Sequence, residues 1–144
     1  MIDGLLVALH VFANLIWIGS IASVGWLTAQ ARELGDNDQG RSAGRMSLAL
    51  YRRFATPAFV CSLLFGVSRL LMAPASYMHL HWFHGKLTFA LGVIALHHVI
   101  GAQAKKVSSG SMQGANNSAI LTLALFVCAF VTVSFATFLR LVFP

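Results

Sequence analysis

The chain has 144 residues, of which 58% are hydrophobic and only 10% charged, and its formal net charge is +6. A soluble domain of ordinary composition carries about a quarter charged residues, so this composition, with its long apolar runs, excludes a soluble globular domain and indicates an integral membrane protein. The basic residues gather in two connections between apolar runs. Such clusters are typical of the loops that set the orientation of a membrane protein. They therefore explain the positive charge without a nucleic-acid-binding surface.

Four apolar stretches are long enough to cross a hydrocarbon layer of about 30 Å. They predict membrane spans at about residues 5–29, 54–73, 82–104 and 119–143. The spans are expected to be helices, because backbone amides in lipid must be satisfied within their own segment. We therefore expect one transmembrane domain over residues 1–144, an all-α four-helix bundle in which Pro57 occupies the first turn of the second span.

The basic connections predict the orientation of the bundle. Arg32, Arg41, Arg45, Arg52 and Arg53 follow the first span, and Lys105 and Lys106 follow the third. Both connections lie after odd-numbered spans and so share one side of the membrane, which the positive-inside rule assigns to the cytoplasm. The sequence thus predicts a multi-pass protein of a bacterial inner membrane with both termini on the outer, periplasmic side.

Ionisable residues interrupt all four predicted spans, which is costly unless they face the bundle interior or reach the interface. They are His10 in the first span, Arg69 in the second, His84, Lys86, His97 and His98 in the third, and Arg140 in the fourth. With the predicted topology, His97 and His98 lie deepest, roughly 20 Å along the helix from His84 at a rise of ~1.5 Å per residue. Histidines that converge in such a bundle can ligate haem or another metal.

A simpler role is open for each of these residues. Arg69, Arg140 and Lys86 could extend to the membrane interface and anchor their helices. His10 could be an interhelical hydrogen-bond partner. Because His97 and His98 are adjacent, they cannot both face one partner, and at least one of them is expected to be structural. The second polar face of their helix is left for a neighbouring helix or for another copy of the chain in a homo-oligomer.

The run "WFHGKLTFALGVIALHHVIG" at residues 82–101 resembles the third span of the HemJ-type protoporphyrinogen oxidase family, which carries Trp, then Lys-Leu, then His-His followed by Gly. The segments "YRRFATPAFVCSLLFGVSRLL" and "LHVFANLIWIGS" are similar to the second and first spans of that family, and the closing "LRLVFP" to its C-terminus. A looser resemblance extends to the four-span membrane proteins related to CopD.

The resemblance implies an oxidoreductase that binds haem b, converts protoporphyrinogen IX to protoporphyrin IX and passes electrons to quinone. It implies that Lys86 and Arg69 act at the reacting site. It further implies a cofactor site formed by His10, His84, His97, His98, Lys86, Trp17 and Arg140, with the axial ligands among the histidines. His10 with His97 or His98 matches the family, whereas helix depth favours His10 with His84, and these pairings stay open.

Two other functions stay open. Where the family carries Pro and Arg after the first span, this chain reads "SIASVGWLTAQAREL", which would suit a haem-binding subunit that lacks the reaction. A copper-handling protein is the other alternative, because thioether and imidazole ligands suit copper. The residues that would serve it are Met72, Met78, His79, His81 and His84, around the predicted outer hairpin.

Overall fold

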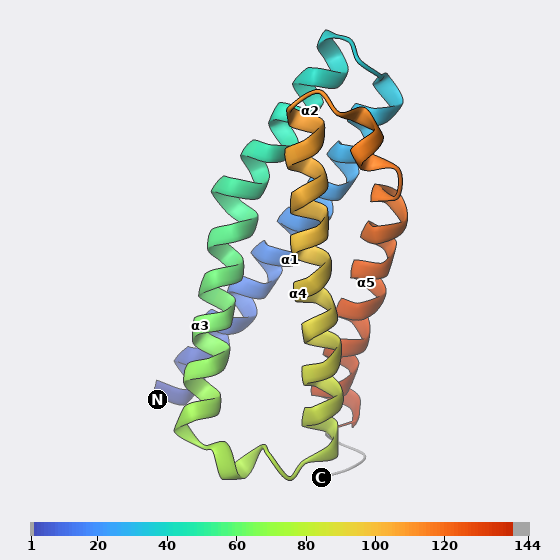
Figure 1. Ribbon diagram of the computed structural model, residues 1–144. Coiled ribbons are helices and arrows are strands. Elements are labelled where there is room, and N and C mark those ends of the chain that lie inside the picture. Colours follow the sequence, from blue (N-terminus) through green and yellow to red (C-terminus); the bar gives the residue numbers. More distant parts are fainter. Residues whose placement is uncertain (1, 140–144) are drawn as a thin grey trace.

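The computed structural model describes residues 2–139, and every regular element within that range is helical. The main helices are α1 (Ile2–Leu34), α2 (Asp38–Leu50), α3 (Thr56–Met72), α4 (His81–Ser108) and α5 (Ser118–Ser134). Short 3-10 turns occur at Pro74–Ser76 and Met112–Ala115, and a π-helical segment, Phe135–Leu139, continues α5. Figure 1 shows the long helices running up and down beside one another, with the start of α1 and the end of α5 at the same end of the bundle.

Four helical stretches of this structure are long and apolar enough to cross a membrane. They are Ile2–Leu34, Asp38–Met72, His81–Ser108 and Ser118–Phe138. The predicted all-α architecture is therefore confirmed for the described residues, and it includes four helices of the length and apolar character predicted for the spans. Which side of the membrane each end occupies stays a prediction.

The second span begins earlier than its apolar run, and Pro57 lies in the middle of it. Helices α2 and α3 are joined without a break by a π-helical segment, Tyr51–Ala55, in which the Thr56 N–H donates to the Tyr51 carbonyl. Proline has no N–H and its ring crowds the carbonyl four residues earlier, so a wider turn lets the helix pass through it. Pro57 thus lies in the first turn of α3, as predicted for the second span, but the helix does not begin there, because the polar residues 38–50 continue into it through the π-helical segment.

Helix α1 is the centre of the bundle. It packs against α2, α3, α4 and α5, whereas the backbones of α3 and α4 seldom come close and these helices meet through the rings of Phe59, His97 and His98. Figure 1 shows these two helices separating toward the hairpin that joins them. The core between the helices is built from Trp17, Ile21, Ala22, Val24, Ala55, Ala58, Val93, Ile100, Ala104 and Leu125.

Glycines set the closest approaches between helices. Gly25 of α1 lies against Thr122 of α5, and Gly101 of α4 lies against the ring of Tyr51, with no room for a Cβ at either glycine. Small residues allow this kind of close backbone contact in membrane bundles. Gly19 of α1, by contrast, has nothing packed against the position of a Cβ.

Candidate functional site

His10 is held in one orientation by two neighbouring helices. Its Nδ1 lies 2.8 Å from the backbone carbonyl oxygen of Ser62 on α3, and because a carbonyl only accepts, Nδ1 carries the proton. Its Nε2 therefore has the lone pair, which accepts a hydrogen bond of 3.1 Å from the side-chain amide of Asn14. The amide oxygen of Asn14 accepts in turn from the Ser62 hydroxyl at 2.8 Å. Metal-ligating histidines are commonly oriented in this way, with the second ring nitrogen donating to a carbonyl.

The surface of α3 that receives the imidazole is flat. A Cβ at Gly66 would lie 2.9 Å from Cε1 of His10, closer than packed carbon atoms normally come. The missing side chain at Gly66 thus allows the imidazole to reach the backbone of α3. A larger residue at position 66 would push His10 away from the carbonyl that orients it.

Two cationic side chains lie near His10. The charges of Lys86, on α4, and Arg69, on α3, both act on the imidazole, and they act on each other. Arg69 Nε lies 3.1 Å from a carboxylate oxygen of Asp3, and its guanidinium lies 5.8 Å from the centre of the Tyr77 ring. Lys86 is half-buried and has no hydrogen bond or ion pair with any residue in the range 2–139. Helices α1, α3 and α4 therefore bring together one oriented histidine and two positive charges. The charge of Arg69 is balanced by Asp3, whereas that of Lys86 has no such partner among the described residues.

His97 occupies a different place, inside the core. It is fully buried, and its ring lies between those of Tyr51 and Phe59, with centroid distances of 5.1 Å and 4.9 Å. Nδ1 of His97 accepts a hydrogen bond of 3.1 Å from Nε1 of Trp17. An indole N–H can only donate, so the proton of the neutral imidazole is on Nε2, which is buried without a hydrogen-bond partner in the described part of the chain. In this tautomer His97 presents no lone pair to a metal, and Trp17 serves as its partner.

The remaining predicted site residues are dispersed. His98 is exposed, and its ring meets Phe59 and His97 edge-on at 5.7 Å and 5.1 Å. His84 is also exposed, and its Nε2 donates to the Met78 carbonyl at 2.8 Å. Arg140 lies outside the described residues. Of the predicted residues, the structure thus gathers His10, Arg69 and Lys86 in one region and pairs His97 with Trp17 in another.

Asn14 and Ser62 were not predicted as site residues. Asn14 lies one helical turn after His10, so its position in an otherwise apolar span was a usable signal. The contribution of Ser62 is a backbone carbonyl in addition to its hydroxyl, and no sequence pattern reports that. Within residues 2–139, no group of three or more His, Cys, Asp or Glu side chains is arranged to hold a metal ion. The histidines of the outer hairpin, named above as copper ligands, therefore do not form such a cluster.

Trp17→Phe is expected to destabilise the bundle without removing a bound cofactor. The substitution removes the hydrogen bond to His97 and leaves that buried imidazole unsatisfied on both nitrogens, which costs about 1–3 kcal/mol. Chemical unfolding in detergent, followed by circular dichroism, measures the effect. The exposed Trp26 of the same helix provides the control, Trp26→Phe, which should change little. Loss of a haem spectrum with unchanged stability would instead place His97 at an iron.

Comparison with known proteins identifies no relative: no family model matches the chain, and no match is found among curated proteins or solved structures.

Proposed function

We propose that the protein binds haem b between α1, α3 and α4 and oxidises protoporphyrinogen IX to protoporphyrin IX, with a quinone as electron acceptor. The observation that carries the proposal is the oriented imidazole of His10, held against α3 at Ser62 and Gly66, with the cations Arg69 and Lys86 close enough for their charges to reach it. The sequence resemblance to the HemJ-type family supports the same reading.

The orientation of His10 suits an axial ligand of haem iron. His10 keeps its proton on Nδ1 through the Ser62 carbonyl, which leaves Nε2 for a metal once the amide of Asn14 is displaced. An oriented, neutral imidazole of this kind is the ordinary protein ligand of haem iron. A bound haem would supply the electron chemistry, while the protein supplies binding and orientation. His98 and His84 stay open as a second ligand, and the Trp17 hydrogen bond argues against His97.

Lys86 and Arg69 fit the acidic groups of a tetrapyrrole. Protoporphyrin IX and protoporphyrinogen IX carry carboxylates on an apolar ring. A cation in a poorly solvated site attracts a carboxylate more strongly than it would in water. Lys86 has no anionic partner among residues 2–139, and Arg69 shares one with solvent, since Asp3 is largely exposed. A carboxylate-bearing ligand would balance this excess of positive charge.

The helix arrangement also suits a ligand that arrives from the bilayer. The backbones of α3 and α4 come close at almost no position, and their ring contacts join Phe59 to His97 and His98, so a flat apolar molecule is proposed to approach His10 on the hairpin side of these rings. The apolar side chains of the surrounding spans would then exclude water from the ring.

The test has two parts. Purified protein, oxidised and then reduced with dithionite, should show a Soret band and the sharpened bands of reduced haem b. Expression of the chain should then restore growth of a bacterial strain that lacks protoporphyrinogen oxidase. A Soret band without complementation would indicate a haem-binding subunit without the reaction. Absence of the band after haem supplementation would contradict the proposal.

Lys86→Gln is expected to lower porphyrinogen oxidation by about 25-fold or more. Removing one partner of a poorly solvated charge pair costs about 2 kcal/mol or more, and each 1.4 kcal/mol corresponds to about a tenfold effect. Lys86→Arg should recover part of the rate, since it keeps the charge. Lys105→Gln, at an exposed lysine of the same helix, is the matched control. Equal, small effects of Lys86→Gln and Lys105→Gln would show that Lys86 anchors its helix at the membrane interface and does not bind the substrate.

A further inference from the structure

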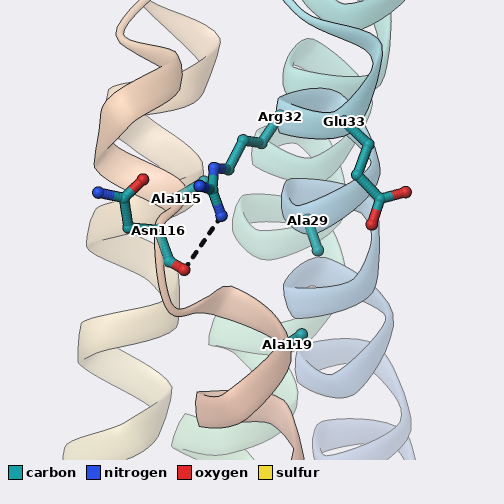
Figure 2. Close-up of a pocket in the computed structure, with 6 residues that line it drawn as sticks. All are labelled: Ala29, Arg32, Glu33, Ala115, Asn116 and Ala119. Carbon is teal, nitrogen blue, oxygen red and sulfur yellow. Dashed lines mark hydrogen bonds between the residues drawn. The ribbon is translucent and has the colours of Figure 1, made fainter.

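A second site lies at the opposite end of the bundle, where the basic connections are. It is an open pocket of about 410 Å³ between the last turns of α1 and the start of α5, lined by Ala29, Arg32, Glu33, Ala115, Asn116 and Ala119. In Figure 2 Arg32 reaches from α1 toward Asn116, Glu33 leaves the same helix on the other side, and Ala29 and Ala119 lie below them. The pocket therefore has a positive wall, a negative wall and a floor of small apolar side chains.

The two charged side chains do not neutralise each other. Arg32 donates one hydrogen bond, of 3.1 Å, to the backbone carbonyl of Asn116, and its guanidinium retains several further N–H donors. Glu33 accepts one, of 3.0 Å, from the side-chain amide of Gln30 and keeps its other carboxylate oxygen free. In the part of the chain that the structure describes, neither residue takes part in an ion pair. A ligand with one negative and one positive group would match both walls.

The pocket straddles the boundary between apolar and polar sequence. The apolar run of the first span ends at Ala29, and that of the fourth begins at Ala119, whereas Arg32, Glu33 and Asn116 lie just beyond these limits. On the side of Ala119, exposed Ile120 and Leu123 continue along the outer surface of α5. A molecule in the pocket would thus have its polar part among the charges and could extend an apolar part along the helix into the hydrocarbon.

We propose that this pocket binds the headgroup of a phosphatidylethanolamine lipid, with the phosphate on Arg32 and the primary ammonium on Glu33. A quaternary ammonium has no N–H to donate to the carboxylate, and an anionic lipid has no cation for it. The carboxylate therefore selects ethanolamine over choline or glycerol headgroups. The site is remote from His10 and does not depend on the proposed haem.

The test uses the full-length protein in detergent, titrated with phosphatidylethanolamine, phosphatidylcholine and phosphatidylglycerol of identical acyl chains and followed by native mass spectrometry. Phosphatidylethanolamine should bind about fivefold more tightly than the other two, the size expected of one interfacial ion pair. Glu33→Gln should lower its affinity to that of phosphatidylcholine, and Arg32→Gln should weaken the binding of all three lipids. Ala119→Leu, which fills the floor of the pocket without changing charge, should weaken them as well.

Arg41→Gln and Asp38→Asn, at exposed positions of the same end of the bundle, are the controls and should leave the lipid preference unchanged. The proposal is overturned if phosphatidylglycerol binds most tightly and Glu33→Gln strengthens it, since the pocket would then be a plain anion site. Equal affinities for the three lipids would also overturn it. Soluble phosphoethanolamine or inorganic phosphate binding as tightly as the lipid would assign the pocket to a free phosphate compound.

Discussion

Replacing His10 by alanine is expected to remove haem from the purified protein while the helical bundle still forms in the membrane. The imidazole is the one predicted ligand that the structure provides with a fixed proton on Nδ1 and a lone pair on Nε2 beside two cations. Removing a residue that only hydrogen-bonds a metal ligand lowers the affinity for the metal by roughly 10–100-fold. Loss of the ligand itself should lower the affinity at least as much. The ratio of Soret absorbance to protein, checked by a pyridine haemochrome assay, measures the loss.

Two control variants separate iron ligation from a structural hydrogen bond. Asn14→Ala removes the amide that occupies Nε2 of His10, so it should leave haem binding intact or improve it. His79→Ala removes an exposed imidazole of the hairpin that is not part of the proposed haem site, and it should have little effect on the His10 site. If His10→Ala and Asn14→Ala instead lower stability equally and neither changes haem content, the role of His10 is limited to the hydrogen bond between helices.

Gly101→Ala is expected to destabilise the folded bundle by about 1–3 kcal/mol, the usual cost of forcing extra volume into a packed core. A Cβ at this position would overlap the ring of Tyr51, which itself packs on the buried ring of His97. To make room for the Cβ, the Tyr51 ring would have to shift and give up part of its packing on His97. Chemical unfolding in detergent should show the change as a lower midpoint with an unchanged slope.

Gly19→Ala is the matched control for this substitution. Gly19 is exposed on α1, with no atom of another residue near the position of a Cβ, so alanine there should be neutral or stabilise the helix by up to about 1 kcal/mol. Equal unfolding midpoints for the two variants would contradict the close contact between Gly101 and Tyr51.

The sequence by itself determined that the chain is helical and has four stretches long and apolar enough to cross a membrane. This follows from physics that acts locally along the chain, because a span needs only enough consecutive apolar residues and backbone bonds that close within the segment. It also identified the ionisable residues that such spans cannot expose to lipid without cost. His10, Arg69 and Lys86 were named on that ground.

Which of those residues meet was decided by the tertiary structure alone. His10 meets a carbonyl of α3, and His97 meets Trp17, a residue 80 positions away in the chain. Such pairings depend on how each helix is tilted and rotated against its neighbours. Packing between the helices sets these angles, whereas the length of an apolar run does not determine them. The same is true of Pro57, since only the packed bundle shows that polar residues 38–50 extend the second span as one helix through a π-helical turn.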